Sequence, residues 1–220
     1  MATSEVLKEL YSKLEKAAGV EERIDLLNRL AFELMNNNDS RFERHSEEAQ
    51  RLSEIAGYTK GKIDAHLNLG RLAFRKSNYA ECIKQSKKAY QLAEQAGDIY
   101  LKAIALDNLS PAYLMRDKPQ RALDAALKAV ELFGERDDPK RARAMSLNNA
   151  GNASNVMGDH ETALKYYSEG LKLLEGTEHY SQQLSIEGNI AACLMHLKEY
   201  REAFNLLEQL HKKFMAIPHF

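Results

Sequence analysis

The sequence predicts an all-α protein, a right-handed α-solenoid of about five helical hairpins with a leading capping helix. Three observations predict this fold. The helix formers Ala, Leu, Glu, Lys, Gln and Arg dominate, and the runs of Val, Ile and Thr that indicate strands are missing. An asparagine recurs at nearly constant intervals along most of the chain. Small residues recur at fixed distances from it, which is the pattern that closely packed helix pairs require.

The repeat becomes visible when the chain is aligned on its recurring asparagine. The aligned residues are Asn28, Asn68, Asn108, Asn149 and Asn189, which lie 40, 40, 41 and 40 residues apart. Mostly small residues stand 14 and 21 positions after each of them: Phe42, Cys82, Ala122, Ala163 and Ala203, then Ala49, Ala89, Ala129, Gly170 and Leu210. These columns mark the places where two helices are expected to approach closely.

The repeats divide the whole chain, 1–220, which is expected to form a single repeat domain. Residues 1–19 supply the capping helix, over 4–18. The repeats are expected at about 20–57, 58–97, 98–136, 137–177 and 178–215, with a tail at 216–220. Each repeat holds a helix A with the asparagine in its middle, a short polar turn and a helix B.

Local signals support the individual helices. Helix A is expected at Lys62–Lys76 and Tyr180–Leu197. Pro119 suits the first turn of a helix B because its missing N–H has no helical partner there. Gly57 and Gly97 follow helices and suit left-handed caps. The predicted B helices are Tyr79–Ala96, Pro119–Phe133, His160–Leu174 and Tyr200–Phe214.

The repeat motifs resemble the tetratricopeptide repeat. The best copies read N-L-G-R-L-A-F…N-Y-A-E-C-I…A-Y in the second repeat and N-A-G-N-A-S-N-V-M-G-D-H-E-T-A-L-K-Y-Y-S-E-G-L in the fourth. Ser110-Pro111 and Ile190-Ala191 replace the family's Leu-Gly pair, and the helix-B aromatic is clear only at Tyr167. The long period is similar to that of kinesin light chains, the mitotic-spindle Leu-Gly-Asn adaptor and bacterial sensor modules. The resemblance covers about residues 20–215.

Stacked hairpins of this kind share one elongated core and present their A helices on a concave groove. A preformed groove binds an extended segment without a large ordering cost. We therefore expect a protein- or peptide-binding adaptor or scaffold, and no enzyme. The predicted groove residues are Asn28, Asn68, Arg71, Arg75, Asn108, Met115, Asn148, Asn149, Asn152, Asn155, Asn189 and His196.

The repeated asparagine has two interpretations, which are compatible with each other. A carboxamide offers a donor and an acceptor, so it can pair with one peptide unit of an extended ligand, and the family resemblance supports this role. Alternatively, each asparagine bonds the adjacent repeat and fixes the stacking. Asn148, Asn149, Asn152 and Asn155 crowd one helix although asparagine is a poor helix former. A conflict of this kind favours a ligand-facing role, the alternative being a solvated surface.

Arg71 and Arg75 lie one turn apart and can take a carboxylate or phosphate in two-pronged contacts. This interpretation implies a partner with an acidic side chain or a free C-terminal carboxylate. The alternative is an ordinary pair matched by acidic residues of neighbouring repeats. Pro111 inside a helix A either kinks the helix and opens the groove or is a tolerated bend.

Composition and motifs argue against several other classes. The chain has a net charge of −1, whereas proteins that bind duplex nucleic acid usually carry an excess of basic residues. Cys82 and Cys193 have no CxxC or Cys/His spacing, and the histidines show no helical pairing, so no metal site and no cofactor are expected. No nucleotide-binding or hydrolase motif occurs. The basic cluster Lys84-Lys87-Lys88 is interpreted as a solvated face.

The two ends of the chain carry signals for localisation and for further association. The N-terminus has no signal-peptide pattern and no apolar run is long enough for a membrane span, so a cytoplasmic protein is expected. The last repeat ends in the apolar residues Leu210, Phe214, Met215, Ile217 and Phe220. This apolar end predicts either that the protein continues beyond residue 220 or that two copies of the chain contact each other here in a homodimer. The alternative function is an N-terminal sensory module of a bacterial signalling protein with a cyclase, kinase or transcription-regulator output domain.

Overall fold

The computed structural model describes residues 4–37, 39–134 and 140–216. Within these ranges the chain is built of eleven α-helices joined by short turns, and no strand occurs in them. The predicted all-α hairpin architecture is confirmed. The chain divides into two compact units, Met1–Ala112 and Tyr113–Phe220. None of the described helices is both long and apolar enough to cross a membrane.

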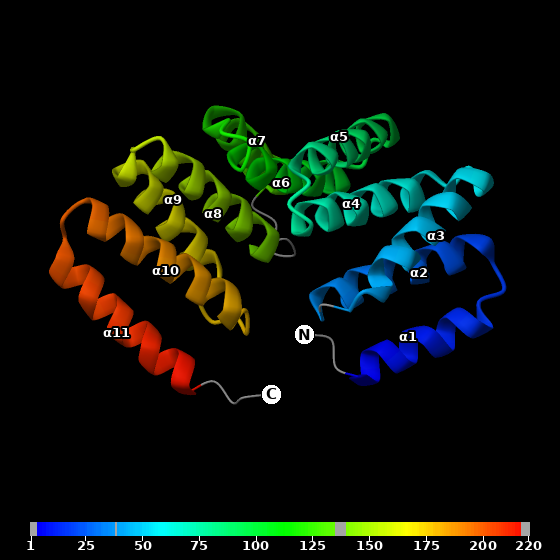
Figure 1. Cartoon of the computed structure of the whole chain (residues 1–220), viewed down its shortest axis with the longest axis horizontal. Coiled ribbons are helices and arrows are strands. Elements are labelled where there is room, and N and C mark those ends of the chain that lie inside the picture. The colour runs from blue at the N-terminus through cyan, green and yellow to red at the C-terminus, as the bar shows by residue number, and fades with distance from the viewer. Residues whose placement is uncertain (1–3, 38, 135–139, 217–220) are drawn as a thin grey trace. The chain divides into compact units, whose positions relative to one another are not determined.

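Unit 1 consists of consecutive antiparallel helices (Figure 1). Helix α2 packs against α3 and α4 against α5, while α1 covers α2 and α3 lies against α4. The boundary between the units falls near the end of α6, which runs through Pro111 without interruption. The helices are α1 (Ser4–Lys16), α2 (Val20–Asn36), α3 (Arg41–Ala56), α4 (Thr59–Arg75), α5 (Tyr79–Ala96) and α6 (Ile99–Leu114).

Unit 2 continues the same pattern of hairpins. Helix α7 packs against α8, α8 against α9, α9 against α10 and α10 against α11. The helices are α7 (Pro119–Phe133), α8 (Lys140–Val156), α9 (His160–Leu173), α10 (Tyr180–His196) and α11 (Tyr200–Ala216). The helix boundaries expected from sequence agree with these within three residues. Thus the fold places A helices α8 and α10 beside the B helix α9.

The small-residue columns are packing positions, as the sequence predicts. Ala49, Ala89 and Ala129 have no exposed surface, and Cys82 is 1% exposed. Ala49 packs with Leu27 and Ala65 in one core cluster, and Ala89 packs with Ile63 and Leu67 in another. In unit 2 the core gathers around Tyr167, Leu174, Ile186 and Cys193. The close helix spacing is evident at Gly170, where an added Cβ would lie 3.0 Å from the carbonyl oxygen of Ala144.

The turn from helix A to helix B has the same backbone shape in successive repeats. Ser77, Asp117, Gly158 and Lys198 all have a positive φ, at 57°, 55°, 83° and 66°. These positions recur with the period of the asparagines, although only Gly158 adopts this conformation without a steric cost. Gly57 and Gly97 cap α3 and α5 with φ values of 68° and 70°, which confirms their predicted role.

Candidate functional site

The asparagines of unit 1 form hydrogen bonds between repeats. Asn28 and Asn68 are each 5% exposed. Nδ2 of Asn28 donates to the carbonyl oxygen of Gly61 at 3.1 Å, and Nδ2 of Asn68 donates to the carbonyl oxygen of Asn28 at 3.0 Å. Nδ2 of Asn108 donates to the carbonyl oxygen of Leu67 at 3.4 Å. These bonds match the interpretation that the asparagines fix the stacking; contact with a ligand stays a prediction for them.

The two arginines of α4 also contact the preceding repeat. The guanidinium of Arg71 lies 5.3 Å from the centroid of the Phe32 ring and donates to Oδ1 of Asn68 at 3.4 Å. Burial lowers the pKa of Arg71, whereas the nearby carboxylates of Asp107 and Asp64 oppose that shift. Arg75 donates to the carbonyl oxygen of Met35. Both side chains therefore have partners within the fold, and contact with an acidic ligand group stays a prediction for them.

In unit 2 the asparagines of α8 and α10 meet in a cluster, here called the amide cluster: Asn148, Asn152, Asn155 and Asn189. The three residues of α8 lie four and three positions apart and so share one helix face. Nδ2 of Asn189 donates to Oδ1 of Asn148 at 2.8 Å and to Oδ1 of Asn152 at 3.2 Å. The amide cluster thus joins the A helices of two successive repeats side chain to side chain.

The side-chain oxygens of Asn148, Asn152 and Asn155 are occupied by protein donors. Oδ1 of Asn152 also accepts from the hydroxyl of Tyr167 at 2.8 Å. Oδ1 of Asn155 lies 3.2 Å from Sγ of Cys193 and 2.7 Å from Nδ1 of His160. Because an amide oxygen can only accept, the thiol and the imidazole nitrogen are the donors in these contacts.

The nitrogens of the same two amides are available. Asn152 and Asn155 are half-buried, and in the described part of the chain Nδ2 of neither has a hydrogen-bond partner. Neither nitrogen is among the buried polar atoms that lack a partner, so both reach solvent. Each Nδ2 carries two N–H donors. Asn152 and Asn155 therefore present N–H donors outward, while their oxygens are held by groups of the protein.

Exposed side chains follow the residues of the amide cluster at the ends of α8 and α10. Val156 and Met195 are 58% and 52% exposed, and the ring of exposed His196 stacks on His160 with centroids 4.7 Å apart. Among the other predicted groove residues of unit 2, Asn149 is half-buried on α8 and Met115 is 54% exposed after the end of α6. Sequence reasoning missed Met195 and the hydroxyl of Tyr167, although Tyr167 stood out as the clear helix-B aromatic.

Potential metal-ligating side chains and two buried cysteines occur within the described ranges. Within the described ranges no three His, Cys, Asp or Glu side chains come close enough to hold a metal ion. Burial raises the pKa of the Cys82 thiol to about 11 and also raises the pKa of Cys193. Both thiols are therefore protonated at neutral pH, and the Cys193 thiol serves as the donor to Oδ1 of Asn155.

The comparisons with known proteins agree with the fold. Residues 62–135 match the family model of the tetratricopeptide repeat. No curated protein matches the sequence. A structure of BtubC (BKLC) from P. vanneervenii matches with a TM-score of 0.78 and 17% identity, over 100% of this chain and 94% of that one.

Two further solved structures match at lower TM-scores. The putative kinesin light chain TPR-like repeats of Podosopora anserina have a TM-score of 0.62 and 16% identity, over 89% of this chain and 96% of that one. PilF of Pseudomonas aeruginosa has a TM-score of 0.65 and 19% identity, over 87% and 78%. At 16–19% sequence identity, these similarities show a shared fold and nothing about function. Residues 62–135 therefore belong to the tetratricopeptide-repeat family, and the chain has the helical-hairpin fold of the structures it matches.

Proposed function

We propose that this protein is a scaffold that holds an extended segment of a partner protein against the amide cluster of α8 and α10. The fold is that of a protein–protein interaction scaffold. The observation that carries the proposal is the pair of solvent-facing amide nitrogens on Asn152 and Asn155, whose oxygens are fixed by Tyr167, Asn189, His160 and Cys193. Fixed oxygens hold the donors in place before a ligand arrives, which lowers the entropy cost of binding.

The chemistry of the cluster indicates what kind of segment it holds. Outward N–H groups pair with acceptors, so they suit the backbone carbonyls of an extended segment or a carboxylate from an acidic side chain or a C-terminus. Exposed Val156 lies one helical turn from Asn152 on α8 and offers apolar contact beside it. Asn149, His196 and Met115 complete the proposed surface in unit 2. In unit 1, Asn28, Asn68 and Asn108, with Arg71 and Arg75, remain predicted ligand contacts.

The test exchanges donors for acceptors without changing the size of the side chain. In the double variant N152D/N155D an Asp oxygen still accepts from Tyr167, Asn189, His160 and Cys193, but the outward N–H groups are lost. Peptides are selected from a random display library on the wild-type protein, and their affinity is measured by titration calorimetry. The double variant is expected to weaken binding at least about tenfold, since two hydrogen bonds are each replaced by repulsion between acceptors.

The control is N205D/Q209E, which adds the same two charges to exposed positions of α11. It should leave the affinity within about twofold of the wild type. If both double variants bind alike, or if N152D/N155D binds as tightly as the wild type, the amide cluster is not the contact surface.

We further propose that α11 pairs with a second copy of the protein. Tyr200, Phe204 and Phe214 are 62%, 68% and 59% exposed, and Leu207 is 45% exposed. Their spacing of four, three and seven positions aligns them along one face of the helix. Of the predicted apolar end, Met215 is also exposed and Leu210 is half-buried, whereas Ile217 and Phe220 lie outside the described residues.

Sedimentation velocity at two concentrations tests this pairing. The wild type should sediment faster at the higher concentration, and F204E/L207E should abolish the dependence because a buried charge opposes pairing. An unchanged sedimentation coefficient in the wild type across concentrations contradicts the pairing.

A further inference from the structure

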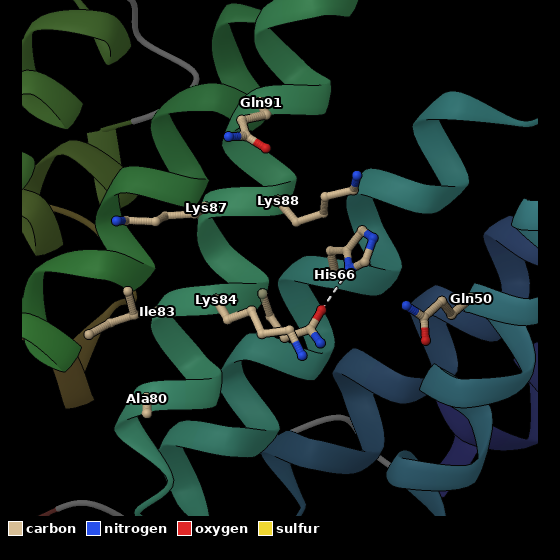
Figure 2. Close-up of a pocket in the computed structure, with 9 residues that line it drawn as sticks. Gln50, His66, Ala80, Ile83, Lys84, Lys87, Lys88 and Gln91 are labelled. Carbon is tan, nitrogen blue, oxygen red and sulfur yellow. Dashed lines mark hydrogen bonds between the residues drawn. The ribbon is translucent and has the colours of Figure 1, made fainter.

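A pocket of about 670 Å³ lies in unit 1 between α3, α4 and α5. It is separate from the amide cluster, which belongs to unit 2. Its wall includes Gln50 from α3, His66 from α4, and Lys84 and Lys88 from α5 (Figure 2). A volume of this order suits a small ligand or a single modified side chain.

The pocket gathers positive charge from α5. In Figure 2, Lys84 and Lys88 extend from the helix toward the side where His66 and Gln50 lie, and Lys87 extends the other way. In the described part of the chain, Lys88 has no ion-pair partner, and Lys84 forms a weak exposed pair with Glu81 at 3.3 Å. The sequence alone suggests a solvated face here, but the fold places two of its three lysines beside a buried histidine.

The protonation of His66 can be assigned from its hydrogen bonds. Nδ1 of His66 lies 2.6 Å from Oε1 of Gln85, and Nε2 of Gln85 donates to the carboxylate of Glu81 at 2.7 Å. A carboxylate accepts, so the amide nitrogen of Gln85 must face Glu81 and its oxygen must face His66. Nδ1 of His66 therefore carries the proton that it donates to Gln85. Its other nitrogen, Nε2, is left as an acceptor when the ring is neutral.

The acceptor nitrogen of His66 has no partner. The side chain is only 6% exposed, and Nε2 is buried without a hydrogen bond in the described residues. Burial lowers the pKa of His66 and outweighs the opposing effects of the Gln85 hydrogen bond and the Glu54 charge, so the neutral imidazole is favoured at pH 7. A buried acceptor without a partner destabilises the folded protein, because it has lost its hydrogen bond to water. A bound group that donates a hydrogen bond to Nε2 removes this destabilisation.

We propose that this pocket binds a phosphate monoester. Its oxygens accept charge-assisted hydrogen bonds from Lys84 and Lys88, and its remaining hydroxyl donates to Nε2 of His66. The second pKa of a phosphate monoester is about 6, so the singly protonated form is accessible near neutral pH. An ionised carboxylate accepts from the lysines but has no proton to give to Nε2. Because Nε2 is buried, binding requires a small side-chain rearrangement at the pocket wall.

The proposal is tested with inorganic phosphate, phosphoserine peptide, glucose 6-phosphate and acetate at constant ionic strength. Two-dimensional NMR of the ¹⁵N-labelled protein follows the backbone amides of α5 and the ring nitrogens of His66. Inorganic phosphate should give saturable shifts confined to α5 and His66, including the Nε2 resonance, whereas acetate should not saturate. Tighter binding of the phosphopeptide assigns the group to a partner protein, and tighter binding of the sugar phosphate assigns it to a soluble metabolite.

Matched variants distinguish phosphate binding at this pocket from a general effect of positive charge on the protein surface. K84Q/K88Q should weaken phosphate binding at least about tenfold, because two charge-assisted hydrogen bonds are lost. The control K165Q/K172Q removes two exposed lysines from the B helix α9 of unit 2 and should change the affinity by less than about twofold. Both pairs lie on exposed surface, so folding is retained. Shifts that stay linear with phosphate concentration, or equal affinities in the two variants, overturn the proposal.

Discussion

The asparagines show that one residue type has different roles in the two units. Asn28 and Asn68 are buried and donate across repeats to backbone carbonyls. Asn152 and Asn155 accept from protein groups and keep their nitrogens at the surface. The recurrence of the asparagines is visible in the sequence, but the direction of each amide depends on donors from other helices. The spacing of the asparagines therefore does not predict which way each amide points.

Gly151 provides a stability test for the packing under the amide cluster. A Cβ added there would lie 2.6 Å from Cδ1 of Tyr167, a ring that is 1% exposed and hydrogen-bonded to Asn152. G151A should therefore lower the free energy of unfolding by about 1–3 kcal/mol. Its control is G188A in α10, where nothing lies within 4 Å of the added Cβ. That change should stabilise the protein by about 0.5–1 kcal/mol. Urea denaturation measures both, and equal effects would contradict the packing.

His66 makes stability depend on pH in a defined direction. Its pKa in the folded protein lies below the ordinary value of 6.5, so the unfolded chain binds the proton more readily. The free energy of unfolding should fall as the pH drops through about 6.5. H66Q should reduce this fall, and H211Q, at an exposed position of α11, should not. Urea denaturation at about pH 7.5 and pH 5.5 measures the effect. A pH dependence unaltered by H66Q would show that the pKa of the buried imidazole is not lowered by folding.

At the scale of the elements, the sequence predicts most of the helices correctly because their signals are local. Pro119 begins α7, and Gly57 and Gly97 end α3 and α5, as expected from their backbone preferences. The start of α4 at Thr59, three residues before the predicted Lys62, was missed because no capping side chain marks it. The pocket was missed because its wall comes from three helices, which are brought together only by the packing of α3 on α4 and of α4 on α5.

The N-cap of α9 is expected to contribute measurable stability. The side chain of Asp159 accepts a hydrogen bond from the backbone N–H of Thr162 at 3.1 Å. D159A should lower the free energy of unfolding by about 1 kcal/mol. The control is K118A at the N-cap of α7, whose side chain makes no capping bond and whose loss should matter by less than about 0.5 kcal/mol. If chemical denaturation finds the two variants equally stable, the side chain of Asp159 does not stabilise α9 as an N-cap.

At the scale of the whole molecule, the repeat period is the strongest signal in the sequence. It predicts the helical hairpins, and it leads to the same family that residues 62–135 match. The binding surface is less predictable from the sequence. Equivalent positions of the repeats look alike in the sequence, but they differ in exposure and in the hydrogen bonds that they already form. Arg71 illustrates this limit, since the sequence leaves open whether its guanidinium binds a ligand or neighbouring acidic residues, whereas in the structure it contacts Phe32 and Asn68.

The proposed scaffold function requires that the amide nitrogens of Asn152 and Asn155 contact the partner. The side-chain NH₂ signals of the ¹⁵N-labelled protein report this directly when a selected peptide is added. We predict that the signals of Asn152 and Asn155 shift and saturate with the peptide, while those of Asn28 and Asn68 stay in place. Saturable binding that leaves the Asn152 and Asn155 signals unmoved would contradict the account.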